Sequence, residues 1–328
     1  MKTVKWGIIG AGGISSTFAT ALNAMENTEV LAVASRNLGR AQGFAKLYHA
    51  KKAYGSYEEL VMDPEIDVIY IGTVNTEHKE NAALCIAHGK SVLCEKPFTV
   101  NQQDTEYLID LAKKHKVFLM EAMWTKFLPT TNTVKQWIKD KKIGEVKYFN
   151  ISFGFQSEFD LKNRVYNPET AGGALLDVGI YPITYAIHMM GRLPDEISSS
   201  AHIGKSDVDE MNVIAFHYNE GVVADLSSAI NAKIGMDAVI IGDKGKIIVP
   251  NFWMASSAIL YDENNKEIDT ISLPHKTNGY EYEAEEVNRC IREGKLESDI
   301  LPLSDTLGII QVMDKIRADW GLKYPTEK

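Results

Sequence analysis

The sequence is poor in cysteine and contains no long hydrophobic run. Among its 328 residues are three cysteines, Cys85, Cys94 and Cys290, whose odd number and wide spacing argue against a disulfide framework or a thiolate zinc site. No apolar run approaches the roughly 20 residues that span a bilayer. The first apolar run, residues 4–9, starts too early to leave room for a signal peptide. We therefore expect a cytoplasmic protein that binds no metal and no membrane.

Positive charge is also scarce. The chain has 35 lysines and arginines against 44 aspartates and glutamates, a formal net charge of −9 at pH 7. This balance repels nucleic acid, so we expect no nucleic-acid partner, although a local basic site can still bind a cofactor phosphate. Hydrophobic residues make up 45% and charged residues 24%, which is ordinary for a globular protein of about two domains.

Residues 1–121 alternate short, continuous apolar runs with stretches whose apolar residues have helical spacing. The apolar runs are residues 4–9, 30–34, 68–72, 91–94 and 117–120. Strands that are apolar on both faces are typical of a parallel sheet covered by helices on both sides. We therefore expect a doubly wound α/β domain of the Rossmann type over residues 1–121.

Residues 122–328 show a different sequence pattern. Several strand-like runs, in which polar and apolar residues alternate, are joined by glycine-containing turns. The runs are residues 146–155, 197–203, 213–218, 222–230, 238–241, 247–249 and 259–261, and helical spacing marks residues 134–138, 174–190, 282–292 and 305–320. The pattern predicts an α+β domain with a large, mostly antiparallel sheet. Too few helices remain to cover the second face of this sheet, so we expect a homodimer or a dimer of dimers built sheet against sheet.

A glycine turn follows the first strand. Gly10, Gly12 and Gly13 precede Ile14, which opens the first predicted helix, and Ser15 stands where a third glycine is usual. Glycines at a first strand–helix junction permit a tight turn and let a pyrophosphate approach the N–H groups of the helix. A plain tight turn is the alternative, but the position favours a dinucleotide.

The second strand ends without an acidic residue. Ser35 and Arg36 stand where an NAD site places a carboxylate for the ribose hydroxyls, and Arg40 follows one helical turn later. A hydroxyl and a planar guanidinium suit a 2′-phosphate. The alternative is that both arginines are solvated surface residues. We expect NADP to be favoured, with NAD possible.

Three residues form a candidate catalytic set. Lys96 follows the fifth predicted strand at the edge of the sheet where active sites of such folds lie, and Lys96–Pro97 is a candidate cis bond. Asp177 and Tyr181 lie four residues apart, which places both side chains on one face of a helix that Pro182 should kink. A surface charge, a cap and a packed ring are the alternative explanations.

These motifs together resemble one family. The glycine turn, residues 73–78, residues 95–97 and residues 173–181 are similar to the glucose–fructose oxidoreductase/inositol dehydrogenase (Gfo/Idh/MocA) family over essentially the whole chain. Residues 121–129 and 171–181 resemble the branch with dimeric dihydrodiol dehydrogenases and NADP-dependent D-xylose dehydrogenases. The resemblance implies a Rossmann domain, an open-faced sheet domain for substrate binding and oligomerisation, and NADP-linked oxidation of a sugar or cyclic diol.

The resemblance also implies roles for individual residues. The family's catalytic positions correspond to Lys96, Asp177 and Tyr181. Its cofactor-binding positions near the nicotinamide correspond to Thr73, Asn75, His78, Glu95, Trp124 and Lys126. The branch more often has arginine at position 126, and lysine cannot make the same forked contacts. Candidate substrate-pocket aromatics, for which core packing is the alternative, are Phe153, Phe155, Tyr166, Trp253 and Tyr280.

The leading hypothesis is an NADP-dependent dehydrogenase in which Tyr181 is the acid/base and Lys96 tunes it. One alternative is a redox-neutral glycosidase of the same family that holds NAD tightly. Ser35 and Arg36 argue against it, because a cofactor that never leaves gains little from phosphate selectivity. The other alternative is a non-enzymatic regulator that senses a dinucleotide. The presence of Lys96, Asp177 and Tyr181 together argues against a pure sensor.

Overall fold

The computed structural model describes residues 1–327, which divide into two compact units. Unit 1 contains Met1–Trp124 and His275–Ile310, and unit 2 contains Thr125–Pro274 and the chain from Gln311 onward. The expected single boundary near residue 121 does not describe this division fully, because residues 275–310 return to the amino-terminal unit. In this segment, helix α8 (Glu281–Glu293) packs against helix α1 (Gly13–Asn23), the first helix of the chain.

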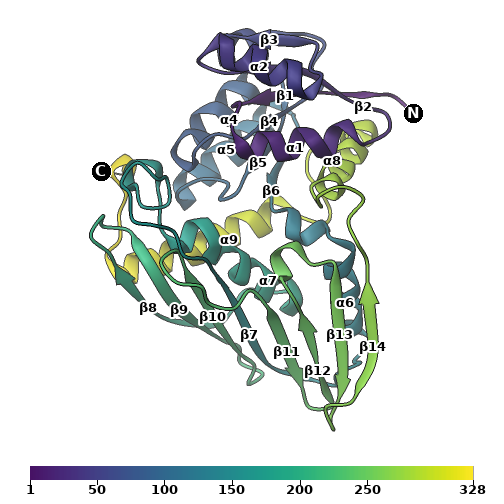
Figure 1. Ribbon diagram of the computed structural model, residues 1–328, viewed down its shortest axis with the longest axis vertical. Coiled ribbons are helices and arrows are strands. Elements are labelled where there is room, and N and C mark those ends of the chain that lie inside the picture. Colours follow the sequence, from purple (N-terminus) through teal and green to yellow (C-terminus); the bar gives the residue numbers. More distant parts are fainter. Residues whose placement is uncertain (328) are drawn as a thin grey trace. The chain divides into compact units, whose positions relative to one another are not determined.

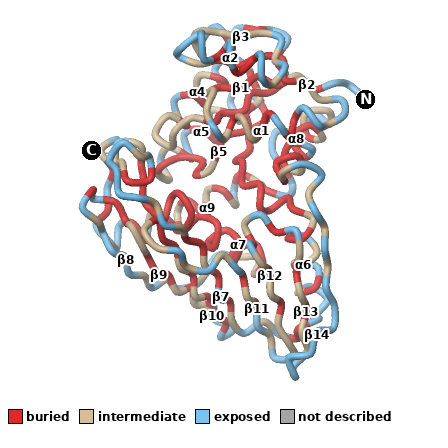
Figure 2. The backbone as a smooth tube through the Cα atoms, in the orientation of Figure 1, coloured by how far each residue is buried: buried red, intermediate tan, exposed pale blue. Residues whose placement is uncertain are grey.

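Unit 1 is built on a six-stranded parallel sheet with the order β3-β2-β1-β4-β5-β6 (Figure 1). The strands are β1 (Val4–Ile9), β2 (Thr28–Ala34), β3 (Lys52–Tyr54), β4 (Val68–Ile71), β5 (Ser91–Glu95) and β6 (Leu119–Ala122). The helices are α1 (Gly13–Asn23), α2 (Leu38–Tyr48), α3 (Tyr57–Val61), α4 (His78–Ala87), α5 (Gln102–His115), α8 (Glu281–Glu293) and α9 (Leu303–Trp320), which continues into unit 2. The central strands are buried along their length (Figure 2). The predicted doubly wound sheet is confirmed.

The strand order places the glycine turn at the switch point of this sheet. From β1 the chain moves outward through β2 and β3, then returns to β4 on the other side of β1 and continues to β6. Because crossovers are right-handed, the helices of the two halves cover opposite faces. Ligands of such sheets bind at the carboxyl ends of the strands where the order reverses. The glycine turn after β1 and the short helix η1 (Asn75–Glu77) after β4 both lie at that edge.

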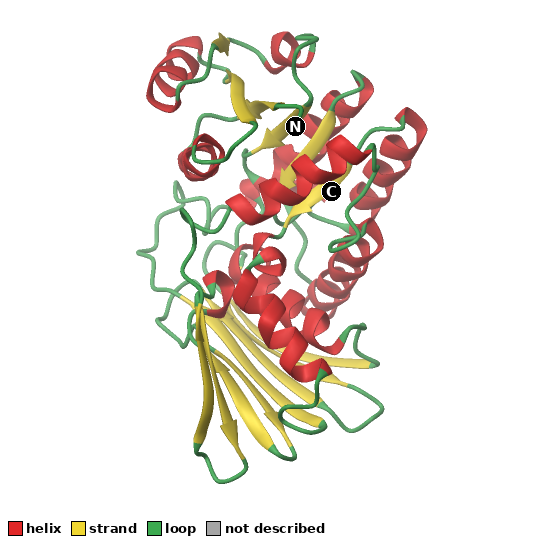
Figure 3. Ribbon diagram, turned by 90° about the vertical axis from the view of Figure 1, so that its right-hand side faces the viewer, coloured by secondary structure: helices red, strands yellow, loops and turns green. Residues whose placement is uncertain are grey.

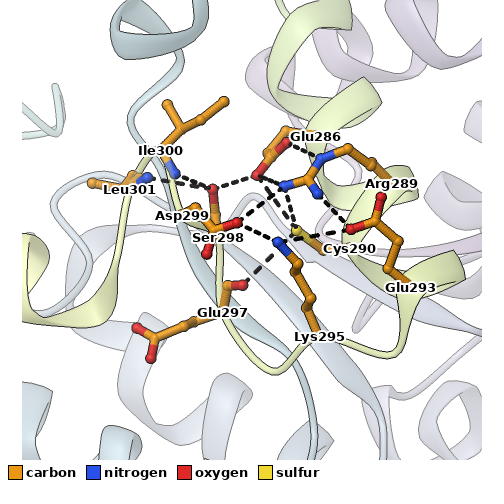
Figure 4. A network of polar contacts seen from close by, with 10 residues as sticks. All are labelled: Glu286, Arg289, Cys290, Glu293, Lys295, Glu297, Ser298, Asp299, Ile300 and Leu301. Carbon is orange, nitrogen blue, oxygen red and sulfur yellow. Dashed lines mark hydrogen bonds and ion pairs between the residues drawn. The ribbon is translucent and has the colours of Figure 1, made fainter.

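Polar contacts join the late segment, residues 275–310, to the rest of unit 1. Trp6 donates from Nε1 to Asn288 Oδ1 at 3.0 Å, and Asn278 donates from Nδ2 to the Thr17 carbonyl at 2.9 Å. Within the late segment, the Glu286 carboxylate in α8 accepts hydrogen bonds from Arg289, one turn along the helix, and from Ser298, which follows the helix (Figure 4). All three cysteines of the chain are buried free thiols.

Unit 2 is built on an eight-stranded sheet with the order β14-β13-β12-β11-β7-β10-β9-β8. Its strands are β7 (Val146–Gly154), β8 (Glu196–Ile203), β9 (Asp209–His217), β10 (Val223–Ala229), β11 (Ala238–Gly242), β12 (Gly245–Val249), β13 (Ser257–Asp262) and β14 (Glu267–Ser272). All neighbours are antiparallel except β7 and β10, so the predicted sheet is confirmed. The edge strand β14 has no counterpart in the sequence analysis because its residues are nearly all exposed (Figure 2).

Helices lie against one face of this sheet (Figure 3). They include α6 (Pro129–Lys139), which contacts β13, and α7 (Ile180–Met190), which contacts β7 and β10. The opposite face carries a row of partly exposed apolar side chains, in which Val239 pairs with Ile248 and Ile248 with Ile259 across three strands. None of the helices described within residues 1–327 has the length and hydrophobicity needed to cross a bilayer.

Candidate active site

The glycine turn leaves room for a ligand at the start of α1. Gly10 has a φ of +93°, and a Cβ there would lie 2.8 Å from the Gly72 carbonyl oxygen, so the backbone requires glycine. At Gly12 and Gly13, by contrast, a Cβ would meet no atom within 4 Å. Gly12 is the N-cap of α1 and has no side chain that could accept a hydrogen bond from the first N–H groups of the helix. These N–H groups can therefore bind a ligand. The turn therefore fits a dinucleotide pyrophosphate.

Ser15 and Ile14 pack α1 against the end of β4. Ser15 is fully buried, and a Cβ on Gly72 would lie 2.3 Å from its Oγ and 3.3 Å from the Ile14 Cγ2. These contacts leave no room for a side chain at position 72. Ser15 thus fills the packing role of the third glycine.

Arg36 forms an ion pair at the predicted phosphate site. Its Nη1 lies 2.8 Å from Glu77 Oε1, and its side chain is 75% exposed. Because Arg36 follows β2 and Glu77 lies after β4, the pair bridges the two strands that flank β1 and its glycine turn. Ser35 accepts the Asn37 N–H with its hydroxyl at 3.3 Å, while Arg40 is exposed in the first turn of α2. A phosphate bound by Arg36 has to compete with Glu77, which the sequence analysis did not identify.

The loop after β4 is held by a buried histidine. His78 is fully buried and lies 2.9 Å by Nδ1 from the Pro97 carbonyl and 3.3 Å by Nε2 from the Thr73 carbonyl. Burial lowers its pKa to about 4, so the imidazole is neutral at pH 7. The Thr73 hydroxyl accepts a hydrogen bond from Asn81 at 3.1 Å. His78 therefore joins the β4 loop, whose short helix begins with Asn75, to the turn after Lys96, whose bond to Pro97 is cis.

Glu95 fixes the backbone that carries Lys96. Its Oε1 accepts the Tyr70 hydroxyl at 2.6 Å, and its Oε2 accepts the Lys96 N–H at 3.1 Å. Tyr70 is fully buried and stacks on Phe18 with ring centroids 3.9 Å apart. Burial, together with the Glu95 charge, raises the Tyr70 pKa, so its hydroxyl remains a donor.

A buried carboxyl group that interacts electrostatically with Glu95 was not identified from the sequence. Glu283 in α8 is fully buried, and neither of its oxygens has a hydrogen-bond partner. Burial raises its pKa well above the usual range, and the charges of Glu95 and Glu121 raise it further, so the site favours the protonated carboxyl group. No local sequence signal distinguishes it from the exposed glutamates of this helix.

Trp124 and Lys126 lie two residues apart in the predicted nicotinamide segment but belong to different units. In unit 1, Trp124 stacks on Tyr280 with ring centroids 4.3 Å apart. Gly279 adopts a φ of +98°, and a Cβ there would lie 2.6 Å from the Trp124 ring. In unit 2, Lys126 is buried, and its charge adds to the effect of burial in lowering the pKa of His188 to about 2.

Tyr181 lies in an aromatic cluster of unit 2. Its ring is tilted against Phe153, with centroids 5.4 Å apart, and meets Trp253 edge-on at 6.1 Å. Phe153 and Trp253 stack on each other at 4.9 Å. Tyr181 is 6% exposed, so most of the ring is enclosed. The structure thus brings two predicted substrate-pocket aromatics into contact with the predicted acid/base.

The other predicted aromatics lie elsewhere. The Tyr166 hydroxyl donates to the backbone carbonyls of Ser157, at 2.9 Å, and Ile230, at 3.3 Å, and so holds a loop. Phe155 is half-buried just beyond β7, and Tyr280 belongs to unit 1. Their roles toward a substrate remain predictions.

The helix that carries Asp177 and Tyr181 differs from the expected one. Residues 174–190 are helical, but Leu175–Gly179 form a π-helix that precedes α7, and Pro182 lies in the first turn of α7. The predicted irregularity therefore begins before Pro182. π-Turns are rare and frequently occur at functional sites. Asp177 lies within this turn and Tyr181 directly after it.

Asp177 is held by an arginine that the sequence analysis missed. Arg164 Nη1 lies 2.8 Å from Asp177 Oδ1, and the Asp177 side chain is 7% exposed whereas that of Arg164 is 55% exposed. Arg164 belongs to the polar loop between β7 and the π-helix, where no spacing distinguishes it from other surface charges. Within residues 1–327, no group of three histidine, cysteine, aspartate or glutamate side chains has a metal-binding arrangement.

Comparison with known proteins agrees with this arrangement along the whole chain. Residues 4–123 match GFO_IDH_MocA, described as an oxidoreductase family with an NAD-binding Rossmann fold, and residues 131–248 match the GFO/IDH/MocA C-terminal domain. Trans-1,2-dihydrobenzene-1,2-diol dehydrogenase from Xenopus tropicalis is 36% identical over 98% of this chain and 99% of its own. The Homo sapiens enzyme of that name is 33% identical over 99% of each chain.

Solved structures share the fold. A 3-ketoreductase from Actinomadura kijaniata, in complex with NADP and TDP-benzene, has a TM-score of 0.87 at 23% identity, covering 97% of this chain and 98% of its own. Aldose-aldose oxidoreductase from Caulobacter crescentus, complexed with glycerol, has a TM-score of 0.87 at 21% identity over 97% of each chain. At these identities the likeness establishes the fold alone.

Proposed function

Because the chain belongs to the GFO/IDH/MocA family of oxidoreductases, we propose that it is an NADP-dependent dehydrogenase acting on a hydroxyl of a sugar or cyclic diol. The observation that carries the proposal is the enclosed Tyr181 ring packed against Phe153 and Trp253 on a helix shared with Asp177. An aromatic wall beside a carboxylate suits a ring with several hydroxyls. Relatives that bear the name of a diol dehydrogenase support the same substrate class.

In the proposed reaction the chain has to move one proton. When bound, the nicotinamide supplies the hydride acceptor, and the substrate hydroxyl must lose its proton to a base within hydrogen-bond reach. We assign this role to the Tyr181 hydroxyl. A tyrosine ordinarily has a pKa near 10, and a nearby ammonium group favours the tyrosinate, which is the role we assign to Lys96. Asp177, held by Arg164, accepts hydrogen bonds from substrate hydroxyls and orients them.

A substrate screen tests the proposal. The purified protein is mixed with NADP and a panel of aldoses, polyols and cyclic diols, and reduction of the cofactor is followed by absorbance. We expect turnover with at least one member of the panel. Tight dinucleotide binding with no turnover anywhere in the panel contradicts a dehydrogenase of this class and favours the sensor.

We also propose that Arg36 binds the 2′-phosphate of NADP, with Ser35 and Arg40 beside it. Glu77 opposes this role, because its carboxylate both occupies the guanidinium and repels a phosphate. Glu77→Gln removes the charge and keeps the shape. We expect NADP to bind about 2- to 5-fold more tightly, the size of an exposed ion pair, while NAD affinity does not rise.

Glu80→Gln is the matched control, because Glu80 is exposed one residue beyond Lys79 in the first turn of α4. Dissociation constants for both cofactors are measured by fluorescence titration. An equal change for NADP and NAD in Glu77→Gln contradicts competition at Arg36.

The bare face of the eight-stranded sheet supports a homodimer, or a dimer of dimers. The apolar row of Val239, Ile248 and Ile259 needs a cover, and a second copy of the same sheet supplies one by symmetry. Light scattering at micromolar concentration should give at least twice the chain mass of 36.5 kDa. A monomer under these conditions contradicts the assembly. The buried free thiols support a reducing cytoplasm as the compartment.

A further inference from the structure

A fully buried carboxylate contacts the first turn of the helix that carries Asp177 and Tyr181. Asp209, the first residue of β9, has no exposed surface. Its Oδ2 accepts the backbone N–H of Leu175 at 2.7 Å and the Nδ2 of Asn212 at 2.9 Å. Its second oxygen, Oδ1, is buried without a hydrogen-bond partner. All of these groups belong to unit 2.

The residues at the start of this helix cannot supply an acceptor for the Leu175 N–H themselves. The first N–H groups of a helix need an acceptor, which an N-cap side chain usually supplies. Here Ala174 is the N-cap and makes no side-chain hydrogen bond, and Gly173 before it has no side chain. Gly173 has a φ of +116°, and a Cβ there would lie 2.3 Å from Asp209 Oδ1. The chain therefore excludes a local cap and takes the acceptor from a neighbouring strand.

The hydrogen bonds of Asp209 continue through Asn212 to a side chain beside the last residue of the π-helix, Gly179. Asn212 accepts the Ser228 hydroxyl at 2.9 Å, and the two residues are register partners on β9 and β10. A Cβ on Gly179, the last residue of the π-helix, would lie 2.8 Å from Ser228 Oγ. Asp209, Asn212 and Ser228 thus touch both the first and the last residue of the five-residue turn that contains Asp177.

We propose that Asp209 is a positioning residue, whose carboxylate, with Asn212 and Ser228, holds the π-turn and thereby aims Asp177 and Tyr181. The proposal rests on the proposed function, in which those two side chains act on the substrate. Asp209 itself acts only through the helix.

The charge of Asp209 supports this role. Burial raises its pKa to about 7, although the bonds from Asn212 and Leu175 and the charge of Arg317 act in the opposite direction. Tyr324 also interacts with it electrostatically. Because the folded pKa lies above the usual 3.8, ionising Asp209 lowers the free energy of unfolding as the pH rises from about 4 to about 7. A group that costs stability at neutral pH while anchoring a functional helix is typical of a residue kept for function.

Two substitutions separate the anchoring contact from the charge. Asp209→Ala removes the acceptor, and we expect kcat to fall about 10- to 100-fold, because small misplacements of reacting groups cost up to that much. NADP affinity should stay within about 2-fold, since the contacts lie in unit 2. Asp209→Asn keeps the acceptor, so kcat above pH 8 should recover to within a few-fold of wild type.

Asp207→Asn is the matched control, because Asp207 lies two residues earlier and is exposed. Hydrogen exchange of the amides of residues 175–181 gives a readout that needs no substrate, and it should accelerate in Asp209→Ala but not in the control. Unchanged exchange, or an Asp209→Ala protein with wild-type kcat, overturns the proposal. If Asp209→Ala fails to fold, Asn212→Ala takes its place, because it removes the hydrogen bonds that Asn212 makes to Asp209 and Ser228. Unchanged exchange together with wild-type kcat in that variant overturns the proposal. A wild type without turnover on any sugar or diol defeats the proposed function, and the exchange experiment still decides the anchoring.

Discussion

Replacing Tyr181 by phenylalanine should lower turnover by about 10²- to 10⁴-fold, the usual contribution of a general base. Phenylalanine keeps the ring and its contacts with Phe153 and Trp253, and it removes only the hydroxyl that takes the proton. NADP affinity should therefore stay within a few-fold. Steady-state kinetics on the substrate found in the screen, with a separate titration of NADP, measure the two quantities.

Tyr185→Phe is the matched control. Tyr185 lies four residues later in α7, is buried, and carries a hydroxyl without a hydrogen-bond partner. Loss of that hydroxyl leaves the Tyr185 contact with Phe252 intact and should change kcat by less than about 3-fold. Near-normal turnover in Tyr181→Phe removes Tyr181 from the mechanism and leaves water as the proton acceptor.

Replacing Arg36 by alanine should weaken NADP by about 10- to 150-fold and leave NAD nearly unchanged. A hydrogen bond to a charged group contributes about 1.5–3 kcal/mol, which corresponds to this range of affinity. The Glu77 carboxylate enlarges the effect, because it repels the phosphate once its arginine partner is gone. Dissociation constants of the variant for both cofactors provide the measurement.

Lys46→Ala tests whether loss of any positive charge in this part of the chain has the same effect, because Lys46 lies on α2, the helix that follows Arg36. Lys46 is exposed in the last turn of α2, away from the residues after β2. It should leave both affinities within about 2-fold. Equal weakening of NADP and NAD in Arg36→Ala assigns the arginine to a part of the dinucleotide that the two cofactors share.

Most of the fold could be predicted from local patterns. Continuous apolar runs identified the strands of the parallel sheet, because strands buried on both faces need apolar residues at every position. The position of Gly10 in the sequence identified the turn, because the φ of +93° found there favours glycine. The π-helix could not be predicted, since an i+4 spacing such as that of Asp177 and Tyr181 looks alike in an α-helix and in a π-turn.

The sequence by itself thus determined the parallel sheet, the mostly antiparallel sheet, the glycine turn and the helix that carries Asp177 and Tyr181. These features depend on backbone preferences and on alternation of polar and apolar residues over a few neighbouring positions. Only the tertiary structure decided the partners of the charged groups: Glu77 for Arg36, Arg164 for Asp177 and Leu175 for Asp209. Such contacts join segments far apart in the chain or in different elements. Their geometry is set by how the sheets and loops pack, which no local pattern records.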